Sequence, residues 1–176
     1  MNRNLNIQDH YNGQTWTAPN QAWVSDITYI RTRQGFAYLF LTTDAYSRKI
    51  VGWELAPSME AKWAISALKQ GLKHRNGSQT IIHHSDHGFQ YGSKEFIDLL
   101  KYNNGMPSMG EAGNCYDNAL AERMNGILKN EYLLDSTFVN MESAKKAVKQ
   151  AIFNYNNCRP HWGLQLRIPA MVHAAA

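Results

Sequence analysis

Three consecutive apolar runs separated by tight turns limit the fold more than any other feature of this sequence. Residues 23–31, 36–43 and 49–55 are rich in β-branched and aromatic side chains, a composition typical of strands. Gln34-Gly35 and Asp44-Ala45-Tyr46-Ser47 supply the turns, and connections this short join antiparallel neighbours. The run 36–43 is apolar on both faces, which predicts a central strand. The first third of the chain is therefore predicted to form an antiparallel meander.

The rest of the chain alternates helical patterns with short strands. A helix that starts at Pro57-Ser58 and stops at Asn76-Gly77 leads to a strand over residues 80–84, and such a crossover makes that strand parallel to its neighbour. Beyond it we predict a helix capped by Ser93, a short strand or extended loop at 106–109, and helices at about 117–132 and 141–155. This order predicts an α/β fold with a mixed five-stranded sheet, three strands antiparallel and the others parallel, flanked by helices as in an RNase H-like domain.

Length and charge narrow the class of protein. A chain of 176 residues, 44% of them hydrophobic, suits one domain with a packed core, and we divide it into a polar arm at residues 1–20 and a core at 21–176. The net charge of +4 permits a nucleic-acid partner without requiring one. Cys115 and Cys158 are far apart, which disfavours a disulfide framework or a thiolate zinc site and makes a reducing cytoplasm the default. No apolar run approaches the length of a membrane span.

Two aspartates stand in positions that suggest chemistry. Asp26 interrupts the apolar run 23–31, where a carboxylate is costly unless it is paired or bound to metal. The alternative is an aspartate on the solvated face of an edge strand. Asp86 follows the strand at 80–84, and the carboxyl ends of parallel strands face the ligand crevice in α/β sheets. An ordinary turn aspartate is the alternative there.

A third acid belongs to a polar stripe on the helix at 117–132. Asn118, Glu122, Asn125 and Lys129 share one face of that helix. Such a stripe is commonly a solvated face. Asparagine and the neighbouring Gly126 are nevertheless poor helix formers, and their presence suggests that a ligand approaches this face closely.

Three carboxylates brought together favour a divalent cation. Two carboxylates about 4 Å apart repel by roughly 4 kcal/mol at an effective dielectric near 20, so a triad without a cation would raise a pKa or open the site. Oxygen ligands suit Mg²⁺ or Mn²⁺, and two such ions can activate a water or hydroxyl and stabilise a leaving phosphodiester oxygen. His83, His84 and His87 invite a zinc interpretation, but no thiol or HExxH spacing supports it, so structural roles are expected for them.

Four ordered motifs carry a family resemblance over about residues 20–172. They are Trp23-Val24-Ser25-Asp26-Ile27-Thr28-Tyr29, His84-Ser85-Asp86-His87-Gly88-Phe89-Gln90-Tyr91, Tyr116-Asp117-Asn118-Ala119-Leu120-Ala121-Glu122, and Tyr155-Asn156 followed by Arg159-Pro160-His161. Thirty-five residues separate Asp86 from Glu122. In these motifs and this spacing the chain resembles the catalytic core of the DDE transposase and retroviral integrase superfamily, and within it the transposases of retrovirus-like bacterial insertion sequences.

The resemblance implies a site and an activity. Asp26, Asp86 and Glu122 would be the catalytic triad and would bind two Mg²⁺ or Mn²⁺ ions, and the chain would nick transposon ends and join the freed 3′-hydroxyl to target DNA. DNA contacts are expected at Lys129, Asn118, Asn125, Arg159 and His161, although helix packing is an equal alternative for Arg159 and His161. The resemblance also implies a homo-oligomer on DNA. It implies a protein of the bacterial cytoplasm that is associated with the nucleoid when DNA is bound.

One departure from the family pattern and two rival functions stand beside these expectations. Full-length relatives carry an N-terminal helix-turn-helix region, and because this chain begins just before the core we expect it to lack recognition of the transposon ends. The rival functions are a metal-dependent nuclease of the same fold and a non-catalytic DNA-binding or assembly domain. The Gly-rich loop at 110–113 is expected to set how firmly Glu122 is held.

Overall fold

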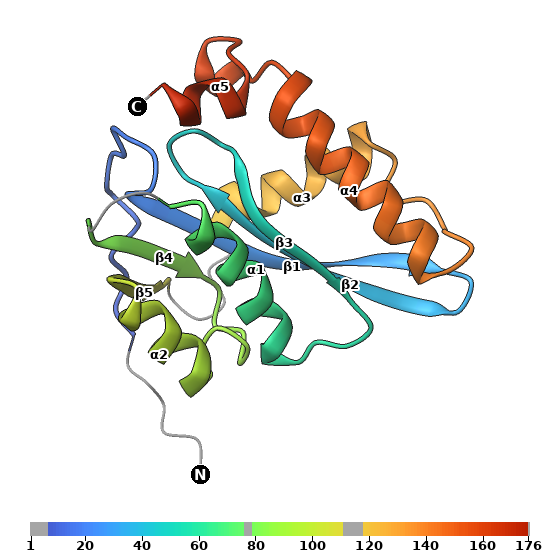
Figure 1. The fold of residues 1–176 in the computed structure, drawn as a ribbon, viewed down its shortest axis with the longest axis horizontal. Helices are drawn as coiled ribbons and strands as arrows, with labels where there is room; N and C mark the ends of the chain where they lie inside the picture. Colours follow the sequence, from blue (N-terminus) through green and yellow to red (C-terminus); the bar gives the residue numbers. More distant parts are fainter. Residues whose placement is uncertain (1–6, 76–78, 111–117, 176) are drawn as a thin grey trace.

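A mixed α/β domain is seen in the computed structural model, which describes residues 7–75, 79–110 and 118–175 (Figure 1). The strands are β1 (Ala22–Thr32), β2 (Gly35–Asp44), β3 (Ile50–Ala56), β4 (Ile81–Ser85) and β5 (Gly105–Met109). The helices are α1 (Ala61–Lys73), α2 (Lys94–Tyr102), α3 (Ala119–Glu131), α4 (Met141–Cys158), a 3₁₀ turn (Trp162–Leu164) and α5 (Pro169–Ala174). None of the helices in these ranges is both long and apolar enough to cross a membrane.

The five strands form one sheet in the order β3-β2-β1-β4-β5. The first three pair antiparallel, while β4 pairs parallel with both β1 and β5. This confirms the predicted meander, the parallel crossover through α1, and the strand alternative at residues 106–109. In the β1–β4 register Val24 stands opposite His84 and Ser25 opposite Ser85, which fixes how the ends of these two strands meet.

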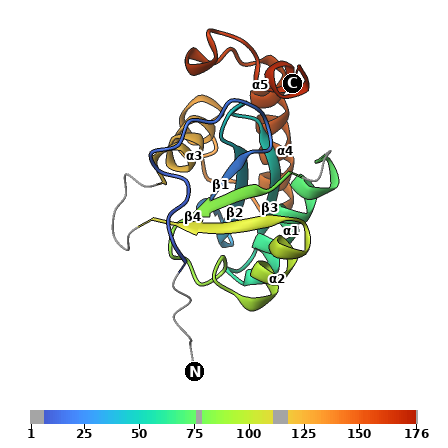
Figure 2. The ribbon, with the colours of Figure 1, turned by 90° about the vertical axis from the view of Figure 1, so that its left-hand side faces the viewer.

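Each face of the sheet has its own core. On one face, α1 and α2 pack over Trp23, Phe40 and Ile81. On the other, α3 and α4 pack over β1–β3, with Met124 and Tyr155 fully buried among them. Figures 1 and 2 show α1 and α2 on one side of the sheet and α3, α4 and α5 on the other. The predicted helical cover of both faces is confirmed.

Two predicted helix limits differ from the structure, and one helix was not predicted. The first helix begins at Ala61 rather than at Pro57-Ser58, because Glu60 adopts extended backbone angles and serves as its N-cap. The last long helix continues to Cys158, three residues beyond the predicted end, because Tyr155 and Asn156 still face the core. The short helix α5, with proline in its first turn, was not predicted. The predicted stop at Asn76-Gly77 lies outside the described residues.

The arm at residues 7–20 has no helix or strand, yet it is fastened to the sheet. The Ser108 hydroxyl of β5 accepts a hydrogen bond from the His10 backbone N–H at 2.8 Å and donates one to Asp9 at 3.3 Å. The Tyr11 ring stacks on His84 with ring centroids 4.7 Å apart. Figure 2 shows the arm rising past β5 and β4 toward the side of the sheet that carries α3.

Candidate active site

Asp26 and Asp86 leave adjacent parallel strands at matching positions. Each lies two residues beyond the paired Val24 and His84, and alternate residues of a strand share a face. Asp26 is still within β1, whereas Asp86 follows the last residue of β4 and is exposed. The two carboxylates therefore come together at the carboxyl end of β4, on the side of the sheet that α3 covers.

The Asp26 carboxylate carries the electrostatic signature of the site. Burial raises its pKa to about 6, and the Asp86 and Glu122 carboxylates add to this rise. Hydrogen bonds from the Ile27 backbone N–H at 2.8 Å and from Asn125 Nδ2 at 2.7 Å oppose it by favouring the charged form. Both neighbouring acids thus act on Asp26 through space, and Asp26 is the deepest member of the group.

The polar stripe on α3 lies along β1. Asn118 Nδ2 donates to the Ser25 carbonyl at 3.0 Å, and Asn125 donates to Asp26. The Lys129 ammonium stands 4.2 Å from the ring centroid of Tyr29, farther along the same strand. Both asparagines are buried, so in this structure their amides hold the strand and the site carboxylate rather than facing solvent. Glu122, between them on the stripe, is exposed.

A tight turn orients Asp86. The Gly88 backbone N–H donates to Asp86 Oδ1 at 3.0 Å. A Cβ at Gly88 would lie 2.9 Å from the Gln90 side-chain oxygen and 3.0 Å from that same carboxylate oxygen. A side chain at this position would therefore push against both side-chain oxygens, including the one that the turn orients.

Tyr91 completes the surroundings of the two aspartates. Its ring is buried against Phe96, and its hydroxyl is a buried polar atom with no hydrogen-bond partner among the described residues. Burial raises its pKa, and the Asp26 and Asp86 carboxylates raise it further. The sequence motif contained Tyr91, but an aromatic residue near a helix start gave no reason to separate it from ordinary core residues.

The three histidines have structural partners, as expected. His83 Nε2 lies 2.8 Å from the Ser25 hydroxyl, and burial lowers the pKa of His83 to about 3. His84 Nδ1 lies 2.9 Å from the Ser108 hydroxyl. His87 Nε2 lies 2.6 Å from the Gly110 carbonyl oxygen. These contacts fasten β4, β5 and the arm around the strand end that carries Asp86.

Arg159 and His161 occupy the junction of α3 and α4. The Arg159 guanidinium donates two hydrogen bonds of 2.6 Å to the Glu131 carboxylate, a bidentate pair that ties the ends of the two helices together. His161 is buried, and its Nδ1 accepts from the Gly163 backbone N–H at 3.2 Å. The Arg159 pair is a contact between helices, whereas the His161 contact is local to the 3₁₀ turn.

The donor set suits a hard divalent cation, although the acids are not gathered around one point. In the described ranges no group of three or more His, Cys, Asp or Glu side chains is close enough to hold a metal ion. Burial, and to a smaller extent the Asp86 and Glu122 carboxylates, nevertheless raise the pKa of Asp26, and a divalent cation would relieve this cost of the charged form. Residues 111–113 of the Gly-rich loop, which was expected to control Glu122, lie outside the described residues.

A sheet ordered β3-β2-β1-β4-β5, with one acid within β1, one directly after β4 and one on α3, which packs on β1, defines an RNase H-like domain with an acidic site. The sequence profile described as "Integrase core domain" matches residues 17–115, and a second profile of the same description matches residues 105–169. The chain therefore belongs to the integrase core domain family, the DDE-type catalytic cores.

Curated relatives agree with this assignment. The chain is 42% identical over 121 residues to a Mycobacterium tuberculosis protein named as a transposase for insertion sequence element IS986/IS6110, covering 66% of this chain and 44% of the relative. It is 37% identical over 158 residues to transposase InsF of an Escherichia coli IS3 element, covering 90% of this chain and 52% of that protein. The chain thus spans about half the length of these relatives.

Solved structures with the same fold are retroviral integrases. The HTLV-2 integrase catalytic core domain in complex with magnesium aligns with a TM-score of 0.69 at 22% identity, covering 89% of this chain and 97% of that one. The simian T-cell lymphotropic virus intasome aligns with a TM-score of 0.77 at 22% identity, covering 94% of this chain and 58% of the other. At these identities the likeness shows the shared fold.

Proposed function

We propose that this chain is the catalytic core of a DNA transposase that hydrolyses and joins phosphodiesters with divalent metal. The observation that carries the proposal is Asp26, a carboxylate in the central strand of an integrase-core fold whose pKa is raised by burial and by Asp86 and Glu122. A buried acid beside two others is costly unless it serves a cation. The transposases among its relatives support the reaction class.

Asp26, Asp86 and Glu122 would hold two Mg²⁺ or Mn²⁺ ions. Bound there, the ions would supply an activated nucleophile and stabilise the leaving oxygen. The chain's own residues prepare the place: Asn125 fixes one oxygen of Asp26, and the Gly88 N–H fixes one oxygen of Asp86. The magnesium bound by the HTLV-2 integrase core supports the choice of metal.

DNA is the proposed partner, in an assembly of several copies. The Lys129 ammonium, held over Tyr29 on the strand that carries Asp26, would contact a backbone phosphate. Asn118, Asn125, Arg159 and His161 would contribute indirectly, since the first two orient β1, Arg159 joins the end of α4 to α3, and His161 holds the turn at Gly163. The intasome among the structural neighbours supports oligomeric action on DNA, and the bacterial relatives support a cytoplasmic, nucleoid-associated protein.

A joining assay tests this function. The chain is incubated with plasmid and a labelled duplex whose 3′-hydroxyl is free, with Mg²⁺ or Mn²⁺. Labelled plasmid is expected from the native chain and from Asp98→Asn, which removes an exposed acid of α2 on the other face of the sheet. It should be lost from Asp86→Asn. Release of nucleotides without joining would instead identify a nuclease, and equal joining by both variants would remove Asp86 from the mechanism.

A further inference from the structure

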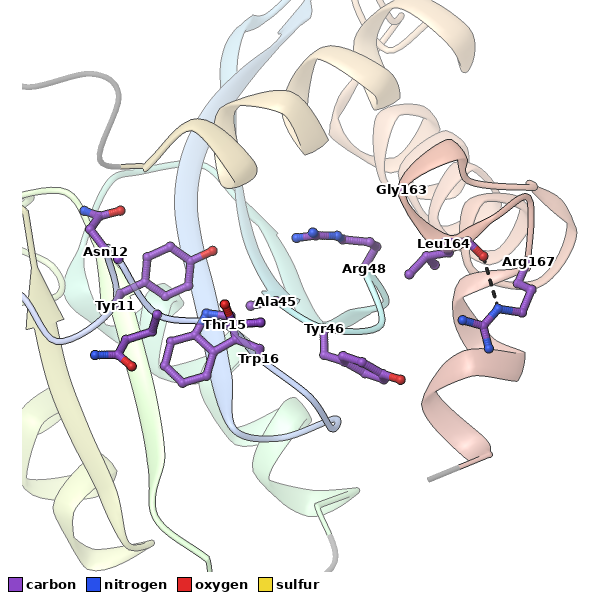
Figure 3. A pocket seen from close by; sticks show the side chains of 12 residues that line it. Tyr11, Asn12, Thr15, Trp16, Ala45, Tyr46, Arg48, Gly163, Leu164 and Arg167 are labelled. Atoms are coloured by element: carbon purple, nitrogen blue, oxygen red, sulfur yellow. Dashed lines mark hydrogen bonds between the residues drawn. The ribbon is translucent and has the colours of Figure 1, made fainter.

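A pocket of about 410 Å³ has none of the three acids in its lining, and the proposed chemistry does not use it. Three segments far apart in the sequence line it: the arm at 11–16, the β2–β3 turn with Ala45, Tyr46 and Arg48, and the stretch from Gly163 to Arg167. In Figure 3 the rings of Tyr11 and Trp16 stand on one side, Leu164 and Arg167 on the other, and Arg48 reaches between them. Its volume is within the range of small-ligand sites.

Aromatic rings form the wall on the arm side. Tyr11 and Trp16 are stacked, with ring centroids 5.6 Å apart and planes 21° from parallel. Tyr11 is also stacked on His84 at 4.7 Å and 28°. The row of rings therefore starts from β4, two residues before Asp86, and ends at Trp16 in the pocket. Flat rings of this kind are platforms for nucleic-acid bases.

Cationic groups face these rings. Arg48 is half-buried, and within the described ranges it forms no ion pair with a carboxylate. Arg167 is exposed and donates one hydrogen bond to the Leu164 carbonyl, which leaves the rest of its guanidinium available. An aromatic wall opposite guanidinium groups matches the two parts of a nucleotide, its base and its phosphate.

The backbone of Arg48 is held in an unfavourable conformation by the β2–β3 turn. Its φ of 63° lies in the left-handed region, where glycine is at ease and arginine is strained. The Tyr155 hydroxyl donates to its carbonyl at 2.9 Å, and its N–H donates to the Asp44 carbonyl at 3.0 Å, so the turn is held in this form. Strain that is kept at one residue is a reason to look for a function there.

The pocket and the acids share one side of the sheet. His84, the first ring of the row, lies two residues before Asp86, and its partner Val24 lies two residues before Asp26. Alternate residues of a strand face the same side of the sheet. Trp23 pairs with Asp44 beside the turn that lines the pocket. Asp26 lies three steps along β1 from Trp23, roughly 10 Å away. A nucleic-acid strand can span this interval.

We propose that this pocket binds an unpaired nucleotide of the DNA strand that enters the acidic site, with its base stacked on Trp16 and its phosphate at Arg48 and Arg167. The inference rests on the proposed function, because only a DNA-processing site presents a strand here. An unpaired base can enter the pocket and stack on Trp16, whereas the bases inside a duplex are already stacked on both faces.

Binding measurements without chemistry test the pocket. Fluorescence anisotropy, recorded in the presence of chelator, compares three labelled DNAs that share the same duplex and differ at one end. The first end is blunt, the second is a short single strand, and the third is the same single strand with abasic sugars. The native chain should bind the base-bearing end about tenfold tighter than the abasic end, the scale of one stacked base. Trp16→Ala should abolish that difference and leave blunt-duplex affinity unchanged.

Arg48→Gly supplies an independent variant. It relieves the left-handed backbone, so the variant should melt no lower than the native chain. Its affinity for single-stranded ends should fall, by the same factor for base-bearing and abasic ends, because a phosphate contact is lost. Lys69→Gln, on the exposed face of α1 across the sheet, removes the same charge and should change neither affinity.

Tenfold preference retained in Trp16→Ala, or no preference in the native chain, would overturn the proposal. If the native chain joins DNA but the Trp16 and Arg48 variants bind all three DNAs as the native chain does, the pocket proposal fails and the proposed function stands. If the preference for base-bearing ends depends on Trp16 but the native chain joins no DNA, the catalytic function fails and the pocket proposal stands.

Discussion

Neutralising Asp26 should stabilise the metal-free protein at neutral pH. Burial, with the Asp86 and Glu122 carboxylates, raises the pKa of Asp26 from 3.8 to about 6. An acid with a raised pKa binds its proton more tightly in the folded chain, so its contribution to stability is greatest at low pH. That contribution declines as pH rises from about 4 to about 6 and is constant above.

The shift sets the size of the effect. About two pKa units correspond to roughly 3 kcal/mol of strain in the ionised form, an upper limit. Asp26→Asn removes this strain but keeps only one of the two hydrogen-bond acceptors used by Ile27 and Asn125, a loss of about 1 kcal/mol. A net gain of about 1–2 kcal/mol is expected at pH 8, and a melting temperature higher by about 2–8 °C.

Thermal unfolding in chelator, from pH 4 to pH 8, checks this expectation. The difference in melting temperature between Asp26→Asn and the native chain should grow between pH 4 and pH 6 and then stay constant. The exposed Asp98→Asn serves as the control and should follow the native curve. A variant less stable than the native chain at pH 8 would refute the claim that Asp26 is strained by its neighbours.

Other substitutions test the supports of the site. Gly126→Ala should stabilise the protein by about 0.5–1 kcal/mol in a chemical melt, since a Cβ there meets nothing within 4 Å, and a loss of DNA affinity would mark close approach of a ligand. Asn125→Ala should raise the pKa of Asp26, moving any pH–rate profile to higher pH by an amount that NMR titration of the carboxyl can verify. Gly52→Ala should cost about 3 kcal/mol in urea unfolding, because its Cβ would overlap the Ala67 carbonyl; unchanged stability would contradict the β3–α1 packing. Lys129→Ala should lower the salt slope of DNA binding by about one unit, whereas an unchanged slope would remove it from the interface.

The sheet could be predicted because its signals are local. β-branched runs with short turns fixed the meander, and the helix before residues 80–84 required a parallel strand. The start of α1 could not be predicted, since Pro57-Ser58 resembles a helix start and only the extended backbone at Glu60 places it later. Helix α5 is too short, at six residues, to show a hydrophobic period.

The site was only partly accessible to sequence reasoning. Periodicity correctly placed four polar residues on one face of α3, but it could not say that Asn118 and Asn125 turn toward β1, because the partner face depends on tertiary packing. The ion pair between Arg159 and Glu131 joins residues 28 apart along the chain and has no local signal. The pocket at Trp16 and Arg48 likewise exists only after the arm docks on the sheet.

The most direct test of the central claim is a crystal of this chain soaked in Mn²⁺ and recorded at the manganese absorption edge. Anomalous peaks are predicted between Asp26, Asp86 and Glu122, with Glu122 drawn toward the two aspartates, and they should vanish in Asp86→Asn while Asp98→Asn retains them. Native crystals with no peak beside Asp26, or with manganese at the histidines of β4 instead, would contradict a catalytic metal site formed by these three acids.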